Sequence, residues 1–203
     1  MKTAFLTIFS ALVLVSGIAN TTYAATAKND DNTYVVLTDV SAINKIEVYG
    51  NVELYVSDAS TDQVKVYNKY YSESALVQST NGVLRISSYK TEKLVVWVSA
   101  NDLRSISAYD NAEVKSFGKI SKIEFNVDLH DNATAKLDLE SFNTNVTVKD
   151  HAKADLSGSA EQYNLTHYAS ATVNNSNFTA AHTDDTRVTV RKAPAANDDL
   201  AIL

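Results

Sequence analysis

The sequence predicts an all-β fold, a parallel solenoid in which coils of about 20 residues stack on one another. A short corner phrase, Asp-Asn-Ala or a close variant, recurs between residues 103 and 178. Its equivalent positions are Asp110, Asp131, Asp150 and Ala169, and the first step between them is slightly longer than the other two. Apolar and polar residues alternate on both sides of each phrase, which is typical of strands with one buried face. One strand–corner–strand unit cannot bury that face alone, so we expect the coils to stack.

Aligning the copies gives columns in which each position holds the same kind of residue. Apolar residues lead into the corner, an alanine follows it, and another apolar residue comes two positions later. We expect these columns to form ladders inside the stack, and the all-alanine column to mark a narrow interior. The polar pair at each corner suits a bent backbone, because short polar side chains bond their own backbone. The interior columns are Ile106, Val127, Val146 and Leu165; Ala112, Ala133, Ala152 and Ala171; and Val114, Ala135, Ala154 and Val173.

An antiparallel β-sandwich with coincidental spacing is the alternative fold. The repeat region contains no Asn-Gly or Asp-Gly pair, and the whole chain has only 5 glycines. Tight hairpins favour such pairs, so their scarcity favours the solenoid.

The N-terminal half is expected to be a less regular part of the same solenoid. Residues 34–38, 43–56, 63–67, 82–87 and 94–98 alternate or are apolar throughout, which predicts strands. Gly50 precedes Asp110 by three such periods and takes the place of the corner aspartate. Asn81-Gly82 is a strong hairpin signal. Residues 69–79 suit a short helix or a loop, and residues 187–191 predict the last strand.

Residues 1–24 have the features of a secretory signal peptide. Lys2 supplies a positive start, residues 4–18 are mostly apolar, and Thr22-Tyr23-Ala24 is a small-x-small cleavage site. A membrane anchor is the alternative, but the apolar run is shorter than the ~20 residues that a span needs. We therefore expect an exported chain with no transmembrane segment after cleavage. The expected parts are a flexible lead-in at 25–33, a single β-helix-like domain at 34–191 and a disordered tail at 192–203.

The composition excludes several classes of protein. The chain has no cysteine, so it has no disulfide, no thiol nucleophile and no thiolate metal site. It also lacks a cysteine to carry a lipid after the signal peptide, so we do not expect a lipoprotein. The formal net charge is −6 and no basic stripe is present, which argues against nucleic acid as a partner. The expected location is the periplasm, the cell surface or the medium.

Several segments, taken in order, resemble a known family. Residues 46–56 read Ile-Glu-Val-Tyr-Gly-Asn-Val-Glu-Leu-Tyr-Val, and Val-Lys-Val at 64–66 and Asn-Gly-Val-Leu-Arg-Ile at 81–86 follow. Val-Trp-Val at 96–98, Leu-Arg-Ser-Ile-Ser at 103–107 and the repeated corners come next. This order resembles the "putative auto-transporter adhesin, head GIN domain" family of exported proteins, common in Bacteroidetes. The resemblance implies a right-handed β-helix-like domain in the periplasm or at the cell surface, and it implies no catalytic residue. Relatives often place Gly or Ser at the corners where this chain has Asp-Asn and Asp-His.

The column Asp110, Asp131 and Asp150 is the sharpest candidate for a site. Carboxylates about 5 Å apart on neighbouring coils could bind Ca²⁺, or act as acid and base on a polysaccharide. The alternative is that they are structural corner residues facing solvent. A catalytic pair needs two unequal environments, which a uniform ladder does not supply. We therefore expect no catalytic residue and no cofactor, and keep the column as a candidate calcium ladder. The polar residues beside it, which are candidates for ligand binding, are Asn111, Asn132 and His151.

Aromatic residues of the N-terminal half are the other binding candidates. Tyr70, Tyr71 and Trp97 could stack on sugar rings, although core packing explains them equally well. The four histidines read as surface residues, and no catalytic or nucleotide-binding motif is present.

The function expected from these observations is that of a non-enzymatic exported domain, an adhesin or a module that binds polysaccharide or another envelope component. A rigid ladder that spaces like side chains evenly would give many weak contacts that add. A polysaccharide-active enzyme, a lyase or hydrolase using the acidic corners, is one alternative. A structural envelope protein that self-assembles through exposed coil edges is the other.

Overall fold

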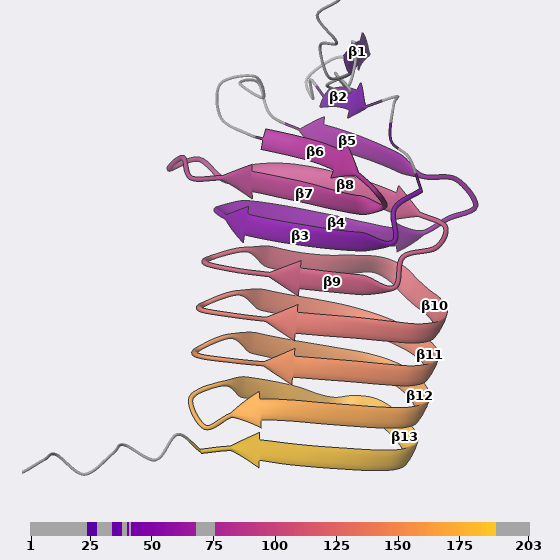
Figure 1. The fold of residues 1–203 in the computed structure, drawn as a ribbon, viewed down its shortest axis with the longest axis vertical. Coiled ribbons are helices and arrows are strands. Elements are labelled where there is room, and N and C mark those ends of the chain that lie inside the picture. Colours follow the sequence, from indigo (N-terminus) through magenta and orange to yellow (C-terminus); the bar gives the residue numbers. More distant parts are fainter. Residues whose placement is uncertain (1–23, 28–33, 38–39, 41, 68–75, 190–203) are drawn as a thin grey trace, which may run out of the picture.

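The computed structural model describes residues 24–27, 34–37, 40, 42–67 and 76–189 (Figure 1). Regular structure in these residues consists of strands, so the all-β prediction is confirmed. The described part of the chain contains no helix long and apolar enough to cross a membrane. The strands are β1 (Ala24–Ala27), β2 (Tyr34–Leu37), β3 (Lys45–Gly50), β4 (Val52–Asp58), β5 (Gln63–Tyr67), β6 (Leu76–Thr80), β7 (Val83–Ser88), β8 (Leu94–Ala100), β9 (Ser105–Ala108), β10 (Glu113–Leu129), β11 (Thr134–Val148), β12 (Lys153–Tyr168) and β13 (Thr172–Val188).

The strands form one mixed sheet that curls back on itself. Strand β10 is its centre, because its first half pairs with β4 and its second half pairs with β9. The long strands β10, β11, β12 and β13 pair in parallel, and each bends so that the chain returns one level along the stack (Figure 1). Each turn of the repeat therefore has a first arm on the β4 side and a second arm on the β9 side.

The four copies of the repeat stack in the expected register. Val114 pairs with Ala135, Ala135 with Ala154, and Ala154 with Val173. The predicted register of the ladder is thus confirmed, and the antiparallel sandwich is wrong for this region. The alanine column also lies in the interior: Ala112, Ala133 and Ala152 are fully buried, and Ala171 is partly buried against the core.

The sheet is not parallel throughout, which corrects the expectation of a parallel β-helix over all of 34–191. Strands β1–β2, β2–β5, β5–β8 and β6–β7 pair antiparallel, while β3, β4, β7, β8 and β9 keep parallel partners. The lower regularity of this half is confirmed. Asn81 and Gly82 both have positive φ (51° and 80°), as a tight hairpin turn between β6 and β7 requires.

Several predicted features lie outside the described residues. They are residues 1–23 of the signal peptide, the tail at 192–203, most of the segment 69–79, and Tyr70 and Tyr71. Strand β1 falls across the predicted cleavage site and lead-in, where it pairs with β2. Of the predicted last strand at 187–191, residues 187 and 188 are the end of the long strand β13, and residues 190–191 lie outside the described residues.

The longer first step of the repeat has a local cause. Asp110 and Asp131 are 21 residues apart, whereas Asp131 and Asp150 are 19 residues apart. Lys115 pairs with Lys136 and Lys119 pairs with Asp138, so β10 has two more residues than β11 between these pairs. A β-bulge absorbs them, and Ser116 Oγ accepts a hydrogen bond from the Asp138 N–H at 2.9 Å. The register between β11 and β12 runs without a shift. The turn formed by β10 is therefore a regular turn with two residues inserted at the bend, which accounts for the longer first step.

The corner aspartates hold the turns together through their carboxylates. Asp110, Asp131 and Asp150 have φ of 59°, 56° and 53°, a region that Asp and Gly tolerate better than other residues. Asp131 Oδ2 accepts the Asp110 N–H at 3.1 Å, and Asp150 Oδ2 accepts the Asp131 N–H at 3.1 Å. Gly50, with φ of 79°, donates its N–H to Asp110 Oδ2 at 3.0 Å, so the predicted equivalence of Gly50 with the aspartates is confirmed.

One column of the interior carries polar atoms. Phe125, Thr144 and Tyr163 pair in register and are all buried, and the Tyr163 ring packs 4.9 Å from that of Phe178. The Tyr163 hydroxyl has no hydrogen-bond partner among the described residues; the Asn175 amide lies near it without hydrogen-bond geometry. Burial raises the pKa of Tyr163 to about 12.

The raised pKa of Tyr163 leads us to expect a loss of stability at alkaline pH. The unfolded chain releases the Tyr163 proton near pH 10, whereas the folded chain holds it to about pH 12. The contribution of Tyr163 to the free energy of unfolding is therefore fully present below pH 10. It falls as the pH rises through this window, by about 1.4 kcal/mol at pH 11. Urea unfolding at pH 8 and pH 11 should show a smaller alkaline loss for Tyr163→Phe than for the wild type. The partly exposed Tyr168 provides the control, and an equal response of Tyr163→Phe and Tyr168→Phe would contradict the assignment.

Candidate functional site

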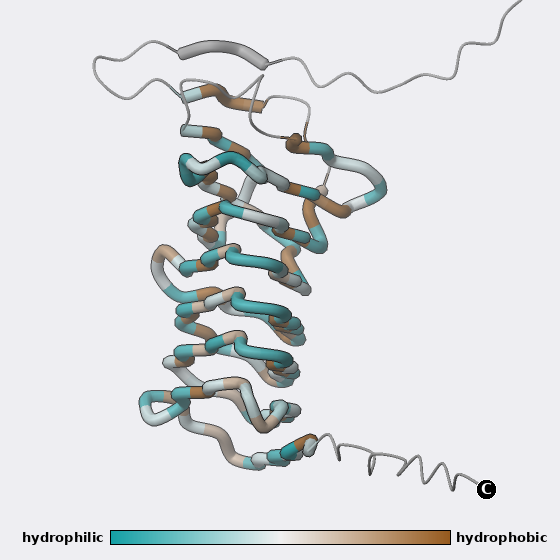
Figure 2. The backbone as a smooth tube through the Cα atoms, turned by 90° about the vertical axis from the view of Figure 1, so that its left-hand side faces the viewer, coloured by the Kyte–Doolittle hydropathy of each residue, from teal (hydrophilic) through white to brown (hydrophobic). Residues whose placement is uncertain are grey.

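The structure brings the predicted aspartates together in a column, where their carboxylates bond the backbone of successive turns. One oxygen of each carboxylate accepts a backbone N–H of the preceding turn. The described residues contain no group of three His, Asp or Glu side chains placed to hold a metal ion. Figure 2 views the stack from the corner side and shows hydrophilic corner segments lying one above another. The neighbouring candidates Asn111, Asn132 and His151 are exposed there, and none of them lines a hollow found in the described part of the chain.

A column of aromatic side chains covers the outer face of the first arm in the N-terminal half. Trp97 alternates with the buried Val96 and Val98 of β8, so its ring faces outward and is half-buried. The Tyr55 ring of β4 stacks on it with centroids 4.7 Å apart and planes 20° apart. Tyr67 of β5 lies 6.4 Å from Trp97 on the other side, and Tyr34 of β2 lies 5.1 Å beyond Tyr67. The sequence candidate Trp97 therefore lies at the centre of the cluster.

A network of charges continues this column downward. Lys115 Nζ lies 5.6 Å from the Tyr55 ring centroid and 2.7 Å from the carboxylates of both Glu53 and Glu113. Glu113 also binds Lys93 at 2.8 Å. Hydrogen bonds to Glu113 and Glu53 raise the pKa of Lys115, and the same bonds lower the pKa of Glu53 and Glu113. The two lysines and two glutamates balance one another, which fixes Lys115 beside the tyrosine ring.

The bulge of β10 places one more aromatic ring at the lower end of the column. Phe117 is 63 % exposed, and its ring lies 5.1 Å from that of Trp97. Gly118, with φ of 79°, follows it and leaves open space, because a Cβ added there would meet no atom within 4 Å. A hollow of about 310 Å³, which we call the bulge groove, lies below the ring. It is lined by Tyr55, Lys115, Ser116, Phe117, Gly118, Lys136, Leu137, Asp138 and Ser157.

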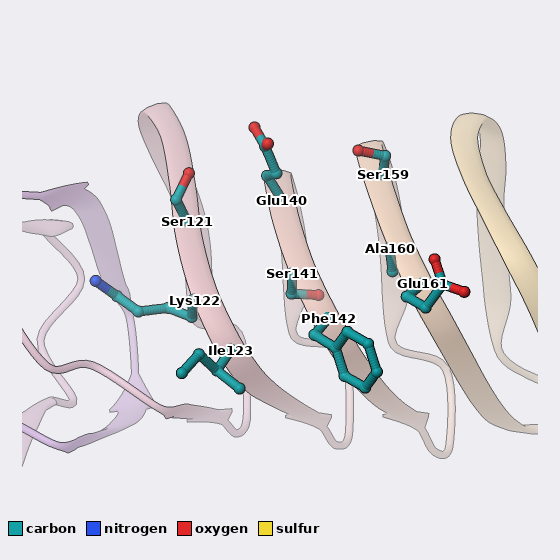
Figure 3. Close-up of a pocket in the computed structure, with 9 residues that line it drawn as sticks. All are labelled: Ser121, Lys122, Ile123, Glu140, Ser141, Phe142, Ser159, Ala160 and Glu161. Carbon is teal, nitrogen blue, oxygen red and sulfur yellow. The ribbon is translucent and has the colours of Figure 1, made fainter.

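A second surface lies at the bend between the two arms, and we call it the bend surface. Its hollow is larger, about 620 Å³, but wide open. Figure 3 shows Ile123 of β10 and Phe142 of β11 projecting from adjacent strands, while Ser121, Glu140 and Ser159 form a second row further along the strands. Ile123 is 83 % and Phe142 57 % exposed. Lys122 lies between Ser121 and Ile123 on β10 and binds Asp58 at 2.5 Å.

The bulge groove is the better candidate for a ligand site. Its volume lies at the lower end of the range for small-ligand pockets, and it combines an exposed ring with charged and hydroxyl groups. β-Bulges also recur next to functional sites, where they re-aim a side chain. Sequence reasoning found Trp97 but missed Phe117, Lys115 and Lys136. The longer first step of the repeat was the one signal in the sequence, because it marked the turn that carries the insertion.

The groove is suited to binding and not to acid–base chemistry. Among its lining residues the one carboxylate is that of Asp138, and the glutamates beside it are held ionised by Lys115 and Lys93. Glycoside hydrolysis needs two carboxyl groups of unequal acidity on either side of a bond. An exposed aromatic ring beside hydrogen-bonding groups suits a ring-shaped polar ligand instead.

Comparisons with known proteins identify the family and the fold. The profile of the family described as "Putative auto-transporter adhesin, head GIN domain" matches residues 42–191. No curated protein matches the chain in sequence.

Three solved structures of similar fold come from Bacteroides and Parabacteroides species. A "putative adhesin" from Bacteroides fragilis has a TM-score of 0.69 at 15% identity, covering 77% of this chain and 77% of that one. A "putative adhesin" from Parabacteroides distasonis has a TM-score of 0.59 at 12% identity, covering 78% and 80%. A "putative lipid binding protein" from the same species has a TM-score of 0.61 at 9% identity, covering 78% and 79%. At these identities the likeness shows a shared fold alone.

Proposed function

Because the chain belongs to the auto-transporter adhesin, head GIN domain family, we propose that it is an exported, non-enzymatic binding domain, an adhesin or a module for polysaccharide or another envelope component. Its scaffold in this proposal is a right-handed β-helix whose stacked turns hold the outer side chains rigidly. The signal peptide expected at residues 1–24 directs it to the periplasm or the cell surface.

The observation that carries the proposal is the aromatic column that ends at the bulge groove. Trp97 and Tyr55 stack on each other, and Phe117 projects from the two-residue insertion in β10. The Phe117 ring packs at a tilt of 58° against the Trp97 ring, which in turn stacks on Tyr55, so the exposed ring has a packed support before a ligand arrives. Less free energy is spent on ordering protein side chains when the site is formed in advance, which favours binding of a flexible saccharide.

The two alternatives have less support. An enzyme acting through the acidic corners would need free carboxylates, whereas one oxygen of each corner carboxylate is engaged by a backbone N–H. Self-assembly into a long fibre would need two open ends. At the other end of the sheet the edge strands β1 and β6 are paired antiparallel, so among the described strands β13 is the edge strand whose pairing is parallel, and a second copy could not continue the parallel stack at both ends.

A glycan array probed with the mature protein and two phenylalanine variants tests the proposal. Phe117→Ala should weaken binding roughly 5–10-fold, because it removes the exposed ring of the site. Phe142→Ala is the matched control, since it removes a similarly exposed ring from the bend surface and should leave affinity unchanged.

The outcome of this pair is decisive for the position of the site. If Phe142→Ala weakened binding and Phe117→Ala did not, the ligand would occupy the bend surface. Absence of binding to glycans of every class on the array, together with binding to phospholipid vesicles, would replace the saccharide by a lipid ligand.

A further inference from the structure

We infer that the ligand of the bulge groove is an acidic saccharide, whose carboxylate or sulfate group binds Lys136. The inference rests on the proposed function and specifies the class of its ligand. It follows from three features of the first arm: the pairing of two lysines, the partners of each, and their position around the groove.

The first feature is a direct lysine–lysine pair. Lys115 of β10 and Lys136 of β11 are partners in the parallel register, so their stems lie about 4.8 Å apart on the outer face. Like charges at directly paired positions destabilise a sheet. Such a pair beside a hollow does not serve to hold the strands together, and because Glu53 and Glu113 already compensate Lys115, an anion beside Lys136 would complete the charge balance of the pair.

The second feature is the unequal share of carboxylates between the two lysines. Lys115 has two close partners, Glu53 and Glu113. Among the described residues Lys136 pairs only with Asp155, at 4.0 Å, and its side chain is 76 % exposed. Asp155 itself accepts a hydrogen bond from Asn174 at 2.9 Å. The charge of Lys136 is thus weakly compensated and available to a ligand.

The third feature is where Lys136 lies. It lines the bulge groove together with Phe117, and it also lines a neighbouring hollow of about 390 Å³ together with Lys153. Lys153 is exposed and has no ion-pair partner in the described part of the chain. A second acidic sugar of the same polymer would therefore meet a second cation one turn further along the stack.

Each of these groups contacts a different part of the ligand. The Phe117 ring supports the face of one sugar, Asp138 and Ser157 offer hydrogen bonds to hydroxyl groups, and Lys136 takes the acidic group. The charge-assisted contact at Lys136 then distinguishes an acidic sugar from its neutral counterpart.

Binding to matched pairs of polymers tests the inference. The pairs are polygalacturonate with its methyl ester, for the carboxylate, and dextran sulfate with dextran, for the sulfate. The mature protein should bind the acidic member of at least one pair 5-fold or more tightly than the neutral member, and which pair responds identifies the group. Lys136→Gln should reduce this preference to less than 2-fold. Lys90→Gln removes an exposed lysine, unpaired within the described ranges, from the loop beside Asn51, and it should leave the preference unchanged.

The outcomes separate this inference from the function on which it rests. Equal binding of acidic and neutral polymers that is still lost in Phe117→Ala would overturn the acidic ligand and leave the binding function standing. An equal effect of Lys136→Gln and Lys90→Gln would show that the preference for acidic polymers comes from the overall charge of the protein, and the assignment of the site to Lys136 would then be wrong. Binding to none of the four polymers would overturn the acidic class, and the glycan array would then decide the function alone.

Discussion

Gly158→Ala is expected to destabilise the protein by about 3–5 kcal/mol, among the largest effects of a single methyl group added to this fold. Gly158 has a φ of 108°, which side chains rarely adopt. An added Cβ would lie 2.0 Å from the Leu139 carbonyl oxygen of the adjacent turn and 2.9 Å from Asp138 Oδ1. The backbone cannot relieve this contact without breaking the β11–β12 ladder. Thermal unfolding should show a midpoint lower by roughly 10 °C or more.

Gly118→Ala is the control for this prediction. Gly118 also has positive φ, 79°, but an added Cβ would meet no atom within 4 Å. Only the backbone strain remains, so a loss of about 1 kcal/mol is expected. Similar losses for the two variants would show that the contact with Leu139 does not constrain the stack.

Asp131→Ala is expected to cost about 2–3 kcal/mol through the loss of a hydrogen bond and the strain of a left-handed backbone. Asp131 combines a φ of 56° with a carboxylate that accepts the Asp110 N–H from the turn above. Alanine removes the acceptor and fits the backbone conformation poorly. The loss is discounted for solvent, because the corner is exposed. Urea unfolding measures it.

Two further variants at this position separate the two causes. Asp131→Asn keeps an oxygen acceptor and a residue that tolerates positive φ, so it should lose less than about 1 kcal/mol. Asp131→Gly keeps the conformation without the acceptor and should fall between the other two. A loss in Asp131→Asn as large as that in Asp131→Ala would mean that the negative charge itself, and not the hydrogen bond, stabilises the corner.

The stacked repeat was predictable because its determinants are local and repeated. The corner residues and the alanine column recur at a nearly constant step, and each turn must bury the same face against the next. Even Gly50 could be placed by its offset of 60 residues from Asp110. Period and polarity together determine such a ladder.

The antiparallel part and the groove were not predictable in the same way. Strand β5 alternates and the strands β2 and β8 are largely apolar, and neither pattern specifies the direction of the neighbouring strand. Phe117 belongs to the insertion in β10, so the alignment of the repeats gives it no equivalent position in the other turns. The alignment of Val114 with Ala135 already placed Lys115 opposite Lys136. The sequence did not show, however, that Glu53 and Glu113 compensate Lys115 and leave Lys136 beside the groove.

The shift-free register between β11 and β12 makes one regular turn of the stack an interchangeable unit. Duplicating such a turn would preserve every side-chain column and lengthen the molecule by one strand spacing, about 4.8 Å. Deleting one would shorten it by the same step. The turn that contains Phe117 is different, because it has two additional residues and cannot be exchanged with a regular turn, and β13 departs from the regular register by one residue. Proteins built this way can vary in reach through gene duplication while the aromatic end stays unchanged.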